Sequence, residues 1–200
     1  LTELSVAHVS VSALRLPHNQ GKAEAVRQGM LQAWQSHASW LGYADADMAT
    51  PPEELIRLLH VATQQASYDG VLGSRVRRAG AQVERQVHRH YLGRVFATAA
   101  SIALGTPFYD TQCGAKFFRR TPRLQQALAR PFRSRWAFDV ELLERLLYPD
   151  SEASPARFLE VPLQKWVDVR GSKLRPRDMM AAGVELAGIL CTARNMGRSR

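Results

Sequence analysis

The sequence predicts a single α/β domain with a mostly parallel sheet and flanking helices. Three observations support this prediction. The 200 residues are 46% hydrophobic and 22% charged, the composition of an ordinary globular domain. Between residues 8 and 75, short apolar runs alternate with helical patterns, and this order favours parallel strands joined by crossover helices. No internal repeat or low-complexity tract interrupts it.

Three strands and a first helix are predicted up to residue 75. Residues 8–16 (HVSVSALRL) alternate small and branched side chains and predict a strand that ends at Pro17. Apolar side chains recur at helical spacing over residues 22–37, which predicts a helix. The apolar run 39–45 (SWLGYAD) predicts a buried second strand, and residues 68–75 (YDGVLGSR) predict a third.

A second helix is predicted directly after the second strand. Thr50 is expected to be its N-cap, Pro51 suits the first helical position, and Glu53 completes a capping box. The helix is expected to end near Ala66. Such a prompt start would fix the end of the strand before it.

The pattern is less regular beyond Arg75. The predicted elements there are a polar loop over residues 76–85, a long helix over 86–104 and short segments over 109–120. They are followed by a helix from about 139, a strand over 156–167 and a final amphipathic helix over 176–195. We expect residues 1–200 to form one domain, with the last of these helices at its C-terminal end.

The net charge of +9 comes mostly from arginine and would attract phosphates of nucleic acid, an anionic membrane or small molecules. A nucleic-acid-binding module ranks low, because most aromatic residues fall inside apolar runs. Cys113 and Cys191 have no partner at metal-finger spacing, so neither a disulfide framework nor a structural zinc is expected. Since no apolar run reaches bilayer length, we expect a cytoplasmic protein with peripheral membrane contact.

Two aspartates mark the end of the second predicted strand. In an extended chain Asp45 and Asp47 project to the same side, where two carboxylates repel unless a cation lies between them. Open parallel sheets bind ligands at this edge. Carboxylate oxygens suit Mg²⁺ or Mn²⁺ that holds a diphosphate. In the alternative interpretation, one aspartate caps a turn and the other is solvated.

Cationic residues are predicted at the same edge of the sheet. Lys22 follows a glycine at a strand-to-helix turn, where free N–H groups and an ammonium would receive an anion. Arg75 ends the third predicted strand. Arg85, His88 and Arg89 share one face of the next helix by their spacing. The alternative for each is a solvated charge.

The chain carries five specific motifs, in the order YADADMATPPEEL, GSRVRRAGAQVER, YDTQCGAKFFRR, RWAFDVELLERL and VRGSKLRP. These resemble the dolichyl-phosphate β-glucosyltransferases and their bacterial relatives, which are inverting glycosyltransferases of family 2 with the GT-A fold. The resemblance runs from about Leu14 to Arg177. It implies a Rossmann-like sheet and transfer of a hexose, glucose from UDP-glucose, to the phosphate of a polyprenyl or dolichyl phosphate.

The resemblance also implies roles for single residues. Asp45 and Asp47 resemble the pair that binds the metal and the nucleotide diphosphate. Arg75 and Arg89 resemble the arginines that related mannosyltransferases place on the acceptor phosphate. The resemblance also implies that Gln112, Lys116, Trp136 and Asp139 line the donor-sugar and acceptor side. We expect Gln112 and Trp136, together with Lys22, on the donor side, Lys116 at the acceptor phosphate and Asp139 at the reacting groups.

The implied reaction needs no strong general base, since the second pKa of a phosphate monoester is about 6 and the acceptor is largely a dianion at neutral pH. Arginines such as Arg75 would hold this nucleophile in line, and the metal at Asp47 would stabilise the departing diphosphate. Asp139 would serve as a base or bind a sugar hydroxyl. Alternatively, it only favours the start of its helix through the dipole.

Two departures from the resembled family stand out. Ala49 replaces a glutamine that reaches the metal in the mannosyltransferase relatives, which favours the glucosyltransferase branch. The family's first strands, with a P-x-Y-N-E-like motif, have no counterpart, so we predict an N-terminally incomplete sequence. The alternatives are mannosyl or other sugar transfer by a related family 2 enzyme, and an inactive fragment.

The predicted helix over residues 176–195 has an apolar side that includes Met180, Val184, Ala187 and Leu190. Such a helix fits the interface of an anionic membrane, the place of a lipid-linked acceptor, and its alternative is packing on the core. A sheet without its first strands would also expose an edge, and pairing of two chains into a homodimer would cover it.

Overall fold

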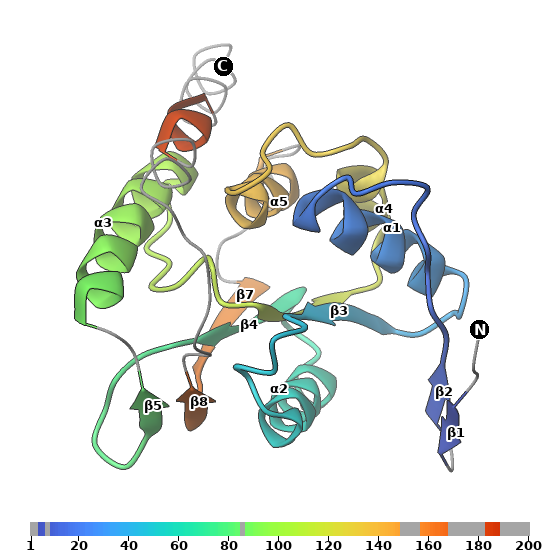
Figure 1. The fold of residues 1–200 in the computed structure, drawn as a ribbon, viewed down its shortest axis with the longest axis horizontal. Helices are drawn as coiled ribbons and strands as arrows, with labels where there is room; N and C mark the ends of the chain where they lie inside the picture. Colours follow the sequence, from blue (N-terminus) through green and yellow to red (C-terminus); the bar gives the residue numbers. More distant parts are fainter. Residues whose placement is uncertain (1–3, 7–8, 85–86, 149–156, 168–182, 189–200) are drawn as a thin grey trace.

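A mixed four-stranded sheet forms the centre of the computed structural model, which describes residues 4–6, 9–84, 87–148, 157–167 and 183–188 (Figure 1). Its strands in spatial order are β3 (Trp40–Ala44), β6 (Ala115–Arg119), β4 (Gly70–Ser74) and β7 (Phe158–Pro162). β4 and β7 are parallel, whereas β6 is antiparallel to both β3 and β4. The predicted α/β class is confirmed, with one reversed strand inserted between two that point the same way.

Helices cover both faces of this sheet (Figure 1). On one face lie α1 (Lys22–Trp34), α3 (Val87–Leu104), α4 (Pro122–Leu128) and α5 (Phe138–Leu147), and on the other lies α2 (Pro52–Gln64). Each face has its own apolar core. Leu41, Leu72 and Phe118 belong to the core under the four helices, and Val71 and Ala115 belong to the core under α2.

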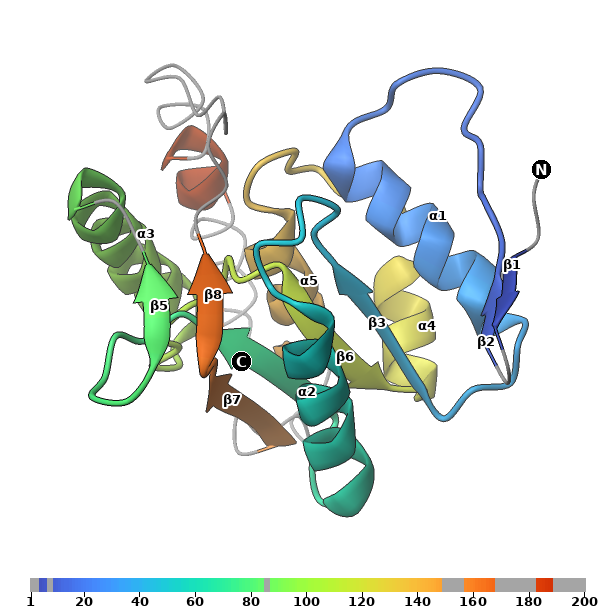
Figure 2. The same ribbon diagram turned by 60° about the horizontal axis from the view of Figure 1, so that its bottom comes forward.

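Two short pairs of strands stand beside the main sheet (Figure 2). β1 (Leu4–Val6) and β2 (Val9–Val11) form an antiparallel hairpin, and β5 (Gln82–Glu84) pairs with β8 (Lys165–Val167) in parallel. The strand predicted over residues 8–16 is thus found, but it is shorter than predicted and covers only Val9–Val11. It pairs with its nearest neighbour in sequence instead of entering the main sheet.

The irregular second half also differs from the prediction. The polar loop over residues 76–85 contains β5, and the single strand over 156–167 is two strands. The corner between β7 and β8 is held by α2, since Arg57 donates to the Pro162 carbonyl at 2.8 Å and Glu54 accepts from the Gln164 N–H at 2.9 Å. Contacts with α2, which is distant in sequence, thus hold the corner that separates β7 from β8.

The capping prediction for α2 is wrong. Pro51, with φ −71° and ψ 158°, is the N-cap, and no side-chain capping bond is made there, so neither Thr50 nor Glu53 caps the helix. A residue before a proline avoids the helical region. Because Pro51 precedes Pro52, the helix starts one residue later than predicted.

The C-terminal part of the chain is described over residues 183–188, which are helical. Leu186 is 3% exposed and belongs to the main core, whereas Val184 is exposed. The rest of the amphipathic helix predicted over 176–195 lies outside the described residues. Within the part of the chain that the structure describes, no helix has the length and apolar character to cross a membrane.

Candidate active site

The two aspartates lie in a tight turn directly after β3. The carbonyl of Asp45 accepts from the Met48 N–H at 3.4 Å, and Oδ1 of Asp47 accepts from the Ala49 N–H at 3.0 Å. Met48 has a φ of 59°, in the left-handed region. The expectation of an extended chain with two carboxylates on one side is therefore wrong, because the chain turns there. Asp45 and Asp47 nevertheless belong to the same short turn.

Lys22 lies next to this turn. Its ammonium nitrogen is 2.6 Å from Oδ1 of Asp45, and it also lies 5.6 Å from the ring centroid of Phe138. The residue before it, Gly21, has a φ of 86°, which a residue with a side chain rarely adopts. The structure thus brings together the start of α1, the aspartate turn and the start of α5.

Gly114 supports Asp45 from the segment that leads into β6. Its carbonyl accepts from the Asp45 N–H at 2.8 Å. A Cβ added at Gly114 would lie 2.0 Å from Cγ of Asp45. Only glycine allows this approach, so the motif that contains Gly114 and Lys116 fixes the aspartate turn through its backbone.

A buried polar cluster of Tyr43, Lys116 and Asp139 lies behind the turn. The Lys116 ammonium is fully buried and donates to Oδ1 of Asp139 at 2.5 Å and to the carbonyl of Cys113. The hydroxyl of Tyr43 donates to the same Oδ1. Burial raises the pKa of Tyr43 well above its ordinary value, and the charge of Asp139 raises it further.

Arg75 follows β4 and is held by Asp110. Its Nε and Nη2 donate to the two carboxylate oxygens at 2.7 and 2.8 Å, and its N–H donates at 3.0 Å. The guanidinium carbon lies 5.4 Å from the ring centroid of Trp166 in β8. Burial alone would lower the pKa of Arg75, but the charge and hydrogen bonds of Asp110 raise it above its ordinary value. A bidentate pair of this kind fixes the plane of the guanidinium.

Asp110 is in turn positioned by Glu160 of β7. The Glu160 carboxylate accepts from the N–H groups of Tyr109 and Asp110 at 2.6 and 2.8 Å. Burial raises the pKa of Glu160 above its ordinary value, although these two hydrogen bonds lower it. A series of hydrogen bonds, from Glu160 of β7 through the 109–110 segment to the residue after β4, therefore positions Arg75.

The other predicted residues have different positions. Trp136 is 42% exposed, and its carbonyl accepts a long 3.5 Å bond from the Gln112 amide. Arg89 belongs to α3, but its side chain lies outside the described residues. Lys116 was predicted on the acceptor side. Its burial against Asp139 instead places its ammonium behind the surface.

Residues that follow Arg75 in sequence line an open groove of about 540 Å³. It is lined by the cationic Arg77 and Arg78 and by the backbone-paired ribbon of β5 and β8, with Ala81, Gln82, Val83 and Val167. The ribbon is tied to the aspartate turn, since the Val167 N–H donates to the Ala49 carbonyl at 3.1 Å. The groove combines positive charge with a lining that is more polar than apolar.

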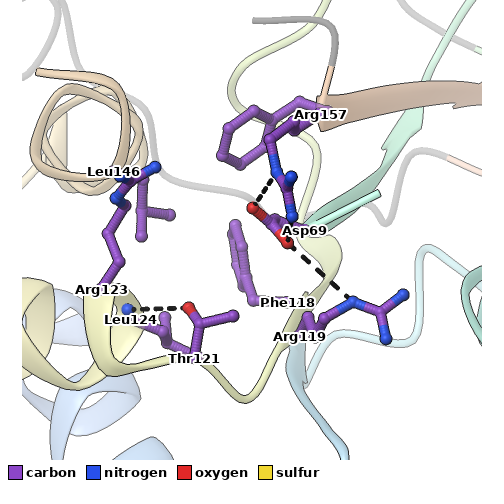
Figure 3. A pocket seen from close by; sticks show the side chains of 9 residues that line it. Asp69, Phe118, Arg119, Thr121, Arg123, Leu124, Leu146 and Arg157 are labelled. Atoms are coloured by element: carbon purple, nitrogen blue, oxygen red, sulfur yellow. Dashed lines mark hydrogen bonds and ion pairs between the residues drawn. The ribbon is translucent and has the colours of Figure 1, made fainter. Parts of the chain in front are cut away.

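A second pocket lies at the opposite edge of the sheet, where β4 and β7 begin and β6 ends (Figure 3). Asp69 receives two hydrogen bonds from Arg157 at 2.5 and 2.7 Å, and Arg119 lies 3.9 Å away. The accessible space is about 10 Å³, roughly that of one water molecule. This pocket is too small for a sugar nucleotide.

Sequence reasoning gave no role to Tyr43, Asp110, Glu160 or Glu185. Tyr43 and Asp110 stand inside the quoted motifs, so their motif membership was a usable signal. Glu160 and Glu185 lie outside those motifs, and the fold brings them to the backbone groups that they bond.

The donor set at the turn fits a hard divalent cation. Asp45 and Asp47 supply carboxylate oxygens, the ligands that Mg²⁺ and Mn²⁺ prefer. Asp45 already contacts the positive charge of Lys22 at 2.6 Å. Among the described residues no third carboxylate, histidine or cysteine joins the pair, so a cation here would take its other ligands from the diphosphate and water.

Comparison with known proteins gives a consistent result. The sequence is similar to the dolichyl-phosphate beta-glucosyltransferases of Drosophila melanogaster (36% identity), Trichomonas vaginalis (30%) and Homo sapiens (30%). The alignments cover 83%, 94% and 83% of this chain and 49%, 54% and 50% of those proteins. The chain thus spans about half the length of the curated relatives that it matches.

The profile of Glycosyl transferase family 2 matches residues 4–146. The mixed sheet with helices on both faces agrees with the GT-A fold that the motifs implied. Since the profile covers well over half of the chain, the chain belongs to glycosyl transferase family 2.

Proposed function

We propose that this chain transfers a hexose, glucose from UDP-glucose, to the phosphate of a polyprenyl or dolichyl phosphate, with inversion at the anomeric carbon. Its relatives are named as dolichyl-phosphate beta-glucosyltransferases. Family membership supports the reaction class. The acceptor and the sugar are proposals for this chain.

One observation carries the proposal: the aspartate turn, the start of α1, the Gly114 segment and the start of α5 meet at one edge of the sheet. Lys22 contacts Asp45 and the ring of Phe138, and Gly114 bonds Asp45. Carboxylates for a metal and cations for phosphates thus stand side by side, as transfer from a nucleotide diphosphate sugar requires.

On the donor side, Asp45 and Asp47 would hold Mg²⁺ or Mn²⁺, which would neutralise the charge of the departing diphosphate. Lys22 would bind the diphosphate directly. Gln112 and the exposed Trp136 would face the sugar. The loop bond between these two residues supports their assignment to one side of the site.

On the acceptor side, Arg75 and Arg89 would bind the phosphate. The groove at Arg77 and Arg78, which follow Arg75 closely in sequence, supports this assignment, because arginines form strong charge-assisted hydrogen bonds with phosphate. An acceptor of this kind lies in a membrane, so we also propose peripheral contact at its cytoplasmic face. Lys116 would act through Asp139 rather than on the phosphate.

Asp139, whose side chain is buried, would bind a sugar hydroxyl or take up a proton through its second carboxylate oxygen, Oδ2. Its Oδ1 already accepts from Tyr43 and Lys116, which fixes the orientation of the group. Preorganised groups of this kind need little rearrangement when charge develops.

The test is a transfer assay with radiolabelled UDP-glucose or GDP-mannose and a short polyprenyl phosphate in vesicles, with and without Mn²⁺. We expect lipid-linked glucose that disappears with Asp47→Ala and with chelator. Transfer from GDP-mannose alone would identify a mannosyltransferase instead. Absence of both transfer and UDP binding would refute the proposal and favour the inactive fragment.

A further inference from the structure

Two carboxylates hold the backbone of the loop that precedes α5. Glu141, in the first turn of α5, accepts from the N–H groups of Arg133 and Ser134 at 3.1 and 2.8 Å. Glu185, from the helical segment 183–188, accepts from the next three N–H groups, of residues 135, 136 and 137, at 3.2, 2.9 and 3.1 Å. Every N–H from 133 to 137 therefore ends on one of two carboxylates.

The contribution of Glu185 differs from that of Glu141 because it comes from a distant part of the chain. The N-cap of α5, Ala137, makes no side-chain capping bond, and the N–H groups at a helix start have no partner within the helix. Glu185 supplies a partner for the N–H of the N-cap Ala137, and its negative charge suits the positive end of the helix dipole. Leu186, next to it, is 3% exposed in the main core and anchors the segment.

The loop that Glu185 holds carries groups of the candidate site. Trp136, one of the three bonded residues, is exposed, and its carbonyl accepts from Gln112. Asp139 lies two residues after the last bonded N–H and accepts from Tyr43 and Lys116. A shift of the loop would therefore move both the exposed ring and the start of α5.

We propose that Glu185 is a positioning residue for the transfer reaction, an inference that rests on the proposed function. Its carboxylate fixes residues 135–137, so that Trp136 and Asp139 keep their places relative to the aspartate turn. The C-terminal segment is thereby a part of the site, although it touches no reacting group.

The experiment compares Glu185→Ala and Glu185→Gln with the wild-type chain in the glucosyl-transfer assay, with donor and acceptor varied separately. We expect a kcat about tenfold lower for Glu185→Ala, because small misplacement of reacting groups is costly. Glu185→Gln keeps one oxygen acceptor without the charge, and we expect it to restore part of this loss. The matched control is Glu53→Ala, which removes an exposed carboxylate from the first turn of α2.

Two further measurements separate positioning from stability. Hydrogen exchange of the peptide over residues 133–138 should become faster in Glu185→Ala, with no change in α1. The loss of kcat should persist well below the Tm of the variant. A kcat within about twofold of wild type, or a loss that vanishes on cooling, would overturn the inference. An inactive wild-type chain would instead refute the proposed function, and this role of Glu185 with it.

Discussion

The ammonium of Lys116 donates a 2.5 Å hydrogen bond to Oδ1 of Asp139, and the two side chains are buried together. Removal of one partner of a buried ion pair leaves an uncompensated charge, which costs about 3–5 kcal/mol. We therefore expect Lys116→Met to lower the free energy of unfolding by this amount in urea titrations, and to abolish transfer.

The double variant Lys116→Met with Asp139→Asn should recover most of that stability, because the asparagine oxygen still accepts from Tyr43. Lys165→Met, at an exposed lysine of β8, is the control and should change little. An equal loss of stability in the single and double variants would contradict the pairing.

Gly114→Ala should disable the aspartate turn. The added Cβ would lie 2.0 Å from Cγ of Asp45, so the carboxylate or the turn must move. We expect transfer activity to fall about 100-fold, as for other displaced reacting groups. Gly29→Ala is the control, since nothing lies within 4 Å of its added Cβ in α1, and it should stabilise the helix by about 0.5–1 kcal/mol. Similar activity in both variants would exclude this role of Gly114.

Arg75→Lys should raise the KM for the acceptor phosphate by about tenfold, with a smaller effect on the KM for the donor, because an ammonium cannot make the bidentate pair with Asp110. Steady-state kinetics with each substrate varied would measure this. Arg120→Lys removes another guanidinium from a tryptophan ring, that of Trp34 at 4.7 Å, and should leave both KM values unchanged. A larger rise in the donor KM would move Arg75 to the donor side.

Cys113 should resist alkylation in the folded chain. Burial raises the pKa of its thiol to about 12, so almost no thiolate exists at neutral pH. We expect iodoacetamide to modify Cys113 only after addition of urea, as measured by mass spectrometry of its peptide in a Cys191→Ser background. Full labelling of the native chain at about pH 8 would disprove the burial of this thiol.

Glu144→Gln should change the pH dependence of stability. Burial raises the pKa of Glu144 above its ordinary value and outweighs the charge of Arg133, which lowers it. The folded chain then keeps this proton to higher pH than the unfolded chain, so the contribution of Glu144 to stability falls as the pH rises from about 4.5.

The Glu144→Gln variant lacks this pH-dependent contribution to stability. Its free energy of unfolding, relative to wild type, should therefore be greater near pH 7 than near pH 4.5 in denaturant titrations. Glu53→Gln, at an exposed position of α2, is the matched control. A constant difference across this range would contradict the raised pKa of Glu144.

Local patterns predicted the elements that depend on local structure. The helix at 22–37 and the strands at 39–45 and 68–75 are found as α1, β3 and β4, since apolar spacing and chain breaks define them. The place of β6 between β3 and β4 was not predictable in this way, because strand pairing is a contact between distant segments.

The residues of the candidate site also divide into those predictable from local sequence and those that depend on contacts between distant segments. Asp45 and Arg75 were found from their places after apolar runs, and both lie at the ends of strands. Glu160 and Glu185 bond residues that lie 48 to 51 positions away in sequence, and nothing in their local sequence indicates a partner. Three-dimensional packing alone specifies such carboxylates.

Because β6 runs opposite to its neighbours, the segments before and after it lie at different edges of the sheet, and substitutions in them should have different effects. The loop before Ala115 enters the sheet at the edge that carries Asp45, and the turn after Arg119 leaves at the edge that carries Asp69. The five residues of β6 separate these edges by about 17 Å. A substitution in the loop before Ala115 should therefore act on the candidate site directly, whereas one in the turn after Arg119 should act on the opposite edge of the sheet.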